Sequence, residues 1–438
     1  MEKRMIQVEE RLPIVQTIPL SLQHLFAMFG ATVLVPFLFK VNPATSLLMN
    51  GIGTLVYLIV SKGRIPAYLG SSFAFIAPVF AVLAVPALGG YAAAQGGFIM
   101  FGIFFVIVSF IVRTVGVGWL DVVFPPAAMG AIVAIIGLEL APVATEMAGL
   151  TGKLIEQLQI PYATAIAVSM FTLAVTILGS VLFRGFLGVI PVLIGVIAGY
   201  ILSIFMGIVD FSSVAAAPWF EVPTLYAPVF NMSAILMIMP AALVVLAEHI
   251  GHLVVTGNIV ERDLVKDPGL DRSLLGDGIS NILSGLVGAT PNTTYGENIG
   301  VMAITKVFSV WVIGGAAVIA ILISFIGKFA ALIRSIPVPV MGGVCILLFG
   351  VIAAAGIRML IEKKVDYTKA RNLILTSVVL VSGISGAAVK FGTVELKGMA
   401  LGTVVAIIIS LLFAFFEKMG WTNDEPASPG IHVADDSK

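Results

Sequence analysis

Long apolar runs separated by short polar connections fill almost the whole chain. A run of about 20 apolar residues is long enough to cross a lipid bilayer as a helix. The first run, Leu20 to Phe39, is too long for the core of a signal peptide and is followed by many others, so it predicts a transmembrane helix and not a cleaved leader. Further segments are predicted at 44–61, 71–86, 93–112, 122–143, 162–183, 188–209, 232–258, 273–289, 296–306, 307–327, 339–357, 371–389 and 398–416.

Two of these fourteen segments, the third and the tenth, are short and interrupted. Segment 71–86 follows Pro66 and Gly70, and segment 296–306 follows Pro291 and Asn292. Proline, glycine and asparagine favour turns and leave the chain non-helical. We therefore expect neither segment to form a full membrane-crossing helix.

Composition and charge agree with a membrane protein. The chain of 438 residues is 59% hydrophobic with a mean hydropathy of +1.10, which excludes a purely soluble protein. Lysine and arginine together number 24, as do aspartate and glutamate, so no basic arm is available for nucleic acid. The single cysteine, Cys345, excludes an internal disulfide.

The distribution of basic residues predicts an orientation, because cytoplasmic connections collect lysine and arginine. If the N-terminus is inside, only six of the 24 basic residues fall on the outer side: Lys40, Lys153, Lys328, Arg334, Lys390 and Lys397. This bias favours fourteen segments with both termini in the cytoplasm.

The chain also contains an internal repeat. Residues 124–130, FPPAAMG, recur 212 positions later as IPVPVMG at 336–342, opening the fifth and twelfth segments. The two interrupted segments are likewise seven segments apart. Because seven is odd, the second half enters the membrane in the opposite orientation, with halves of about 1–215 and 225–416. Inverted repeats with broken segments are typical of secondary transporters; chance similarity is the alternative.

Ionisable residues inside apolar segments indicate function, because burying them in a membrane costs free energy. Glu248 and His252 are four residues apart and share one helix face, whereas His249 points elsewhere. A carboxylate beside an imidazole is suited to handling protons. The alternative is a structural pair that ties this segment to the first one through His24. A zinc protease site is not predicted, since it needs the order H-E-x-x-H.

A second carboxylate, Glu297, follows a stretch that Pro291 and Gly296 keep from being helical. An extended segment inside a membrane needs a partner for its backbone groups. Residues 71–75, at the symmetry-related position, are the natural partner. Two short antiparallel strands, each leading into a half-helix, would then aim the N–H groups of Phe73 and Gly296 at a central cavity.

Residues 297–306, ENIGVMAITK, resemble the signature of the nucleobase-ascorbate transporter family, and Gln23–His24 resembles its second hallmark. Residues 17–30 and 290–298 are similar to the bacterial uracil permeases within that family. The likeness covers about 12–416.

This resemblance implies an all-α membrane fold of two inverted seven-segment repeats, with short strands in segments 3 and 10. It implies a proton symporter that is commonly a homodimer in the bacterial cytoplasmic membrane, without cofactor or enzymatic activity. The implied parts are cytoplasmic tails at 1–19 and 417–438, a core domain at 20–112 and 232–327, and a gate domain at 122–209 and 339–416.

The resemblance also assigns roles to single residues. Glu248 and Glu297 would hold the ring N–H groups of uracil, and His252 would share in proton coupling. The remaining pocket residues would be Phe73 and Gly296, as backbone N–H donors, and Ala31 and Tyr295, as pocket lining. Supporting positions are His24, Ser72, Asn298 and Phe349. Phe349 departs from the family, where a tyrosine can contact the pocket from the gate domain.

The function expected from these observations is proton-coupled uptake of uracil. A purine such as xanthine or urate is the alternative substrate, and carboxylates would also permit sodium coupling. A channel is less favoured because no filter motif is present. Glu139 and Asp277 lie inside segments and are expected to be structural or to line the gate.

Overall fold

The chain folds into a mostly helical molecule. The computed structural model describes residues 5–151, 153–391 and 394–422, so the predicted tails lie partly outside the described residues. The helices of the first half are α1 (Ile14–Ala27), α2 (Phe29–Phe39), α3 (Pro43–Val60), α4 (Ile76–Leu83), α5 (Gly90–Val115), α6 (Gly118–Val123), α7 (Pro126–Glu139), α8 (Ala141–Met147), α9 (Lys153–Gln157), α10 (Tyr162–Leu182), α11 (Pro191–Phe205) and α12 (Ser212–Ala216).

Among the described residues, the second half has eight further α-helices, and four short strands are present. These helices are α13 (Met232–Val260), α14 (Leu270–Val287), α15 (Gly296–Thr305), α16 (Val310–Ser324), α17 (Gly327–Arg334), α18 (Val338–Glu362), α19 (Ala370–Ile384) and α20 (Gly398–Lys418). The strands are β1 (Leu69–Ser71), β2 (Asn292–Thr294), β3 (Ala388–Phe391) and β4 (Val394–Lys397). A short 3-10 turn, η1 (Phe73–Phe75), links β1 to α4.

Length and hydropathy confirm a multi-pass membrane protein. In the described part of the chain, seven helical segments are long and apolar enough to cross a membrane: α3, α5, α7 with α8, α10, α13, α18 and α20. The bent pair α1–α2 passes the same test, and Phe73–Leu83, α11, α16 and α19 are shorter apolar helices.

Outward-facing apolar side chains support the same conclusion. On α10, Leu178 is 55% exposed and Val181 is 75% exposed, and α19 presents Leu373 and Val381 in the same way. Large apolar surfaces of this kind are unfavourable in water. They are expected where lipid tails replace the solvent.

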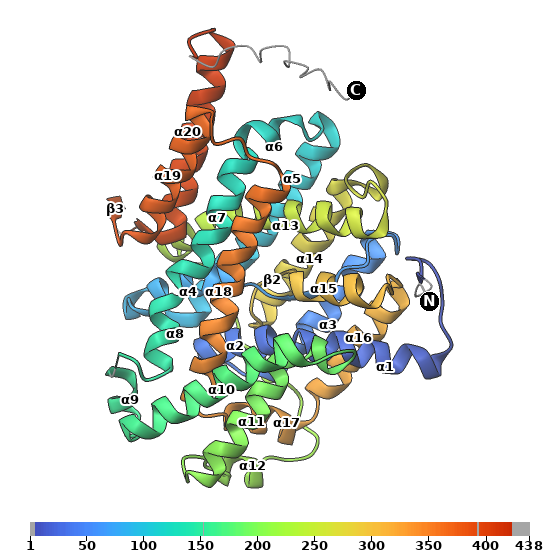
Figure 1. The fold of residues 1–438 in the computed structure, drawn as a ribbon, viewed down its shortest axis with the longest axis vertical. Coiled ribbons are helices and arrows are strands. Elements are labelled where there is room, and N and C mark those ends of the chain that lie inside the picture. Colours follow the sequence, from blue (N-terminus) through green and yellow to red (C-terminus); the bar gives the residue numbers. More distant parts are fainter. Residues whose placement is uncertain (1–4, 152, 392–393, 423–438) are drawn as a thin grey trace, which may run out of the picture.

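The helices pack as two groups (Figure 1). In one group α14 packs against α3 and α5, and α16 packs against α1 and α3. In the other group α18 lies beside α7 and α10, and α19 and α20 pack against each other and against α7. Glu139, at the end of α7, accepts a hydrogen bond from the backbone N–H of Met399 (2.7 Å), so it has the structural role of capping α20.

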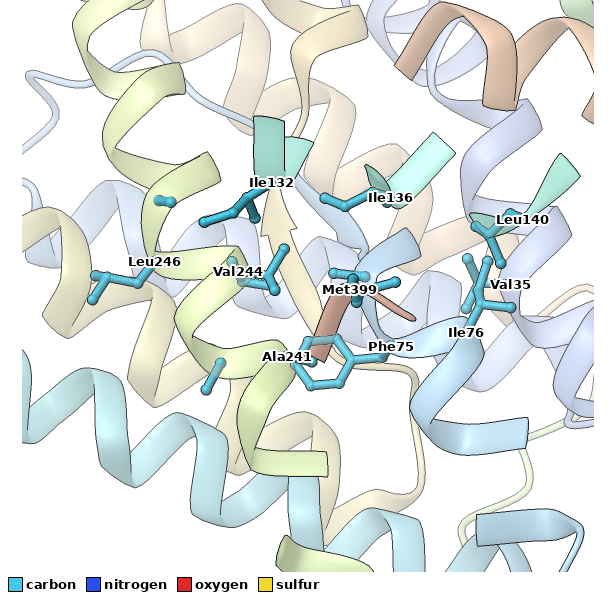
Figure 2. Close-up of a cluster of buried hydrophobic side chains, with 14 of the residues drawn as sticks. Val35, Phe75, Ile76, Ile132, Ile136, Leu140, Ala241, Val244, Leu246 and Met399 are labelled. Carbon is cyan, nitrogen blue, oxygen red and sulfur yellow. The ribbon is translucent and has the colours of Figure 1, made fainter. Parts of the chain in front are cut away.

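Apolar side chains fill the contact between the two groups (Figure 2). On the side of the first group, α2, η1, α4 and α13 contribute Val35, Phe75, Ile76, Ala241 and Val244. On the side of the second group, α7 and α20 contribute Ile132, Ile136 and Met399, and Leu140 follows α7. All of them are buried. The two groups therefore pack against each other through apolar side chains at this contact.

The predicted first segment, Leu20–Phe39, is wrong as a single straight helix. Helix α1 begins at Ile14, inside the predicted tail 1–19, and the chain bends by 42° between α1 and α2. The physical reason is a side chain that enters the helical hydrogen-bond ladder. The carbonyl of His24 accepts from Nδ2 of Asn298 (3.3 Å) as well as from the N–H of Met28, whose bond is lengthened to 3.3 Å.

Strands β1 and β2 pair antiparallel across the interior of the molecule, with Leu69 opposite Thr294 and Ser71 opposite Asn292. Backbone bonds beyond the strands extend the ladder, from Tyr295 N–H to the Tyr68 carbonyl (3.0 Å) and from Ser72 N–H to the Pro291 carbonyl (2.8 Å). Each unpaired backbone group at membrane depth would cost several kcal/mol. The ladder thus makes the two helix breaks stable.

The N-terminal segment crosses one end of the first group. Ile6 forms a parallel bridge with Val307, directly after α15, and Val8 is fully buried. The two terminal guanidinium nitrogens of Arg262, just after α13, donate to Glu9, with Nη2 to Oε2 at 2.9 Å. The segment therefore connects the ends of α13 and α15.

We predict that Gly70→Ala destabilises the ladder. A Cβ at Gly70 would lie 2.2 Å from Cε2 of Tyr295, so the buried ring would have to move. Such overpacking costs about 1–3 kcal/mol. Thermal unfolding of the purified protein in detergent measures the loss.

The matched control is Gly314→Ala in α16, where the nearest atom to the new Cβ is 3.6 Å away. This control should melt at or above the parental temperature, because alanine favours the helix. An equal loss in both variants would contradict the steric explanation.

We also predict that the contribution of Glu9 depends on pH. Arg262 lowers the pKa of the Glu9 carboxyl, so the pair stabilises the fold at neutral pH and loses its effect as pH falls through that lowered value. The pair is largely exposed, so Glu9→Gln should cost less than about 1 kcal/mol.

Melting temperatures of the Glu9→Gln and parental proteins at low salt should differ at pH 7 and converge at acidic pH. High salt should also remove the difference. A gap that persists under both conditions would show that the carboxylate charge is not the cause.

Candidate functional site

The candidate site lies where two helix N-termini meet beside the β1–β2 ladder. After β1 the chain enters η1 at Phe73, and after β2 it enters α15 at Gly296. The N-cap residues Ser72 and Tyr295 accept no bond from their own helices through a side chain. The first N–H groups of both helices are thus available to carbonyl oxygens or anions.

Glu248, His252 and Glu297 come together at this place. Nδ1 of His252 lies 3.0 Å from Oγ1 of Thr294, and its Nε2 lies 3.3 Å from the position of a Cβ on Gly296. Helix α13 therefore presents His252 to the start of α15. Glu248 lies one helical turn before His252 on α13, and Glu297 is in the first turn of α15, which packs against α13.

Partial exposure distinguishes these residues from their surroundings. Glu248, His252, Gly296 and Glu297 are all half-buried, whereas most of the neighbouring side chains of α13 are buried. Polar side chains that remain accessible inside an apolar molecule are suited to contact a polar solute.

Phe73 and Phe349 form an aromatic pair at this site. Their ring centroids are 5.9 Å apart at an interplanar angle of 84°, an edge-to-face arrangement. Phe73 is half-buried and Phe349, on α18, is only 1% exposed. The pair joins the two groups of helices, and Phe349 makes an aromatic rather than a polar contact.

Three residues predicted to line or support the pocket are buried beneath the accessible surface of the site. Tyr295 is 3% exposed and donates its hydroxyl to the carbonyl of Ser71 (3.1 Å), and Ala31 and Ser72 are also buried. Tyr295 therefore fixes the two strands to each other from behind, by packing its ring against Gly70.

His24 and Asn298 connect α1 to α15. Nδ2 of Asn298 lies 3.0 Å from Nδ1 of His24, and both residues are buried. His24 therefore bonds to the tenth predicted segment through Asn298. It was considered as a tie to the segment that carries Glu248, but its hydrogen-bond partner lies on α15 and not on α13. His24 instead holds the half-helix that carries Glu297.

A buried polar network beside the site was not predicted as functional. Oδ2 of Asp277 on α14 lies 3.0 Å from Nδ1 of His249, and both side chains are completely buried. Nε2 of His249 lies 2.7 Å from Oγ of Ser273, which in turn lies 2.6 Å from the hydroxyl of Tyr57. The network therefore joins α3, α13 and α14.

The same network reaches the strand ladder. Nδ2 of Asn281 donates to Oδ1 of Asp277 (3.0 Å) and to the carbonyl of Asn292 (3.0 Å), while its Oδ1 accepts from the N–H of Asn292 (2.6 Å). Asp277 thus holds Asn281, and Asn281 in turn holds Asn292 of β2. The sequence signal was a polar stripe on α14, namely Ser273, Asp277, Ser280, Asn281 and Ser284.

No cluster of three or more histidine, cysteine, aspartate or glutamate side chains suited to a metal ion occurs among the described residues. The site can offer two carboxylates, one imidazole, backbone N–H groups and an aromatic face. This set suits a small planar solute with both donors and acceptors.

Broken helices that meet at half-buried polar groups in a multi-pass protein define the transporter class of membrane folds. Two solved structures share this fold. The transmembrane domain of the cyanobacterial bicarbonate transporter BicA aligns with a TM-score of 0.63 at 16% identity, covering 92% of this chain and 100% of that domain. Murine Slc26a9, an anion transporter, aligns with a TM-score of 0.66 at 12% identity, covering 93% and 69%.

The chain belongs to the permease family whose profile, described as "Permease family", matches residues 15–392. Its curated relatives include the uracil permease of Escherichia coli K12, 66% identical over 94% of this chain and 95% of the relative. The uracil permease of Paenibacillus larvae is 61% identical over 97% and 100%, and that of Bacillus subtilis is 48% identical over 90% and 91%.

We predict that the buried Asp277 carboxyl depends on His249 for its stabilisation. His249→Leu should cost roughly 3 kcal/mol, because it removes the side chain that lies 3.0 Å from Oδ2 of Asp277 and leaves that oxygen without a partner. Adding Asp277→Asn to that variant should restore part of the loss, since the amide removes the charge and can still accept from Asn281.

A double-mutant cycle measured by thermal unfolding tests this coupling. The matched control is His24→Leu, a buried histidine whose partner is a neutral amide, and Asp277→Asn should not rescue it. Additive losses in the His249 cycle would refute the pairing.

Proposed function

We propose that this protein is a proton-coupled symporter that imports uracil across the bacterial cytoplasmic membrane by alternating access. The observation that carries the proposal is the packing of α13, which bears Glu248 and His252, against the start of α15, which bears Glu297, in a chain 61% to 66% identical to proteins named uracil permease. Carboxylates accept hydrogen bonds, and the two ring N–H groups of uracil donate them.

In the proposed complex, Glu297 and Glu248 accept the ring N–H groups. The backbone N–H groups of Phe73 and Gly296, at two helix N-termini, donate to the uracil carbonyls. The ring of Phe73 packs against the pyrimidine, and Ala31 and Tyr295 shape the pocket from behind. His24, Ser72 and Asn298 support the two half-helices.

Proton coupling follows from the two neighbouring carboxylates. Two like charges at one site repel, so protonation of Glu248 favours binding of a neutral pyrimidine beside Glu297. His252, one helical turn from Glu248, is placed to pass the proton. We propose that no other cofactor takes part.

Transport then requires the two groups of helices to move against each other. We propose that α1–α5 and α13–α16 form the core domain and that α7–α11 and α18–α20 form the gate domain, in a fold of two inverted seven-segment repeats. In support, α7 and α18 both begin at proline pairs, and β1–η1–α4 matches β2–α15. We further propose that both termini are cytoplasmic and that the protein is a homodimer.

The central prediction concerns Glu248. Glu248→Ala should abolish uptake of labelled uracil into membrane vesicles, because the site loses its acceptor and its proton carrier. Glu248→Gln should still bind uracil but should lose accumulation driven by a pH gradient.

Glu139→Gln is the matched control, because Glu139 is a carboxylate in an apolar segment whose role is to cap α20. It should retain pH-driven accumulation that a protonophore collapses. Parental uptake by Glu248→Ala would overturn the site.

Competition in the same vesicles tests the substrate. Unlabelled uracil should compete with the label, whereas xanthine and hypoxanthine should not. Competition by xanthine would favour the purine alternative, and uptake driven by a sodium gradient without a pH gradient would overturn proton coupling.

A further inference from the structure

A polar cavity of about 420 Å³ opens at the end of the second helix group, away from the candidate site. It lies between the start of α7, the connection from α18 to α19 and the last turns of α20. In the proposed orientation this is the cytoplasmic end of the gate domain. The transport mechanism proposed above uses none of its residues.

Four basic side chains line the cavity, namely Lys363, Lys364, Lys369 and Arg371. Three acidic residues, Asp121, Asp366 and Glu417, also line it. Two of these acids are already bonded: Asp366 accepts from the Thr368 hydroxyl (2.6 Å) and Glu417 accepts from Arg371 (3.1 Å). With four basic and three acidic side chains, the formal charge of the whole lining is +1, and two of the three carboxylates already accept hydrogen bonds.

A helix N-terminus adds to this positive potential. Helix α7 has 14 residues and begins at Pro126, and its N-cap, Pro125, provides no side-chain cap. Both prolines and Ala127 line the cavity. The first free backbone N–H of α7, that of Ala127, therefore lies at the cavity wall, where an anion is stabilised.

Ser410 points independently to a ligand. It lines the cavity from α20 and is only 3% exposed, yet its Oγ has no hydrogen-bond partner among the described residues. A helical serine usually bonds to a carbonyl of the preceding turn. A buried hydroxyl without a partner is unfavourable, and a bound acceptor oxygen would remove that cost.

An aromatic cluster next to the cavity indicates where the cavity lies relative to the membrane surface. Phe415, Phe416 and Trp421 contact one another, and Trp421 is 67% exposed. Exposed tryptophan is enriched where a membrane meets water. The cavity therefore lies at the level of the lipid headgroups.

We propose that this cavity binds a phosphate group. Lysine and arginine side chains, a helix N-terminus and a serine hydroxyl all donate to phosphate oxygens. The phosphate can come from a phospholipid headgroup of the adjoining leaflet or from a soluble phosphate in the cytoplasm. Its binding would fix the connection from α18 to α19 against α7 and α20.

The test is thermal unfolding of the full chain in a neutral detergent. One arm adds inorganic phosphate against sodium chloride of equal ionic strength, and the other adds phosphatidylglycerol or phosphatidylethanolamine micelles against detergent alone. At about a 100-fold excess over Kd, binding should raise the melting temperature by about 3 °C.

Two variants make the test specific. Ser410→Ala should melt at or above the parental temperature without ligand, because it removes an unpartnered hydroxyl, yet it should lose at least half of the ligand-induced shift. Lys363→Gln/Lys369→Gln should lose most of the shift. The control Lys62→Gln/Lys266→Gln removes two lysines that do not line the cavity and should keep the shift.

Each outcome bears on the proposal. A shift with inorganic phosphate identifies a soluble source, and a shift with phospholipid alone identifies a headgroup; both support the site if the variants reduce them. No shift in either arm, or equal shifts in the parental protein and both cavity variants, would overturn it. The readout is independent of uracil uptake, so it fails or succeeds separately from the proposed function.

Discussion

The pairing of β1 with β2 is the constraint on which the rest of the structure depends. A helix break inside an apolar molecule exposes backbone N–H and C=O groups, and water is not there to satisfy them. Two breaks from opposite halves of the chain solve the problem for each other, since Ser71 pairs opposite Asn292 and Leu69 opposite Thr294. Each strand then leads directly into a helix, and the two helix N-termini are brought to one place.

The polar residues around the ladder serve the same constraint. Asn281 bonds to both backbone groups of Asn292, and Thr54 bonds to both backbone groups of Leu69. Asp277 holds Asn281, and His249 holds Asp277. A chain of buried groups therefore transmits the position of α13, which carries Glu248 and His252, to the strand that precedes Glu297.

Sequence reasoning found the residues whose chemistry is unusual for their surroundings. Carboxylates are rare inside apolar segments, so Glu248 and Glu297 stood out, and the four-residue spacing of Glu248 and His252 needed only helical geometry. The interruptions at Pro66–Gly70 and at Pro291–Asn292 likewise mark the places where the ladder lies.

Structural features that depend on contacts between residues far apart in the chain could not be predicted from the sequence. The bend at Met28 arises because Asn298, about 270 residues away in the chain, bonds to the His24 carbonyl. The pairing of His249 with Asp277 requires knowledge of which faces of α13 and α14 meet, and spacing within one helix cannot supply this. The hairpin of β3 and β4, with Lys390 paired to Glu395, replaces the end of the predicted segment 371–389 and was not expected.

The distribution of polar bonds also supports the proposed movement of the two groups of helices. The two histidines of α13 bond within their own group, His249 to Ser273 and His252 to Thr294, and Glu139 bonds to Met399 within the other group. The contact between the groups is filled by apolar side chains and by the edge-to-face pair of Phe73 and Phe349 (Figure 2). Apolar contacts are non-directional, so sliding replaces one with another, whereas a hydrogen bond across the contact would have to break without water to replace it. Polar bonds within each group and apolar contacts between the groups therefore support the proposed movement of one group against the other.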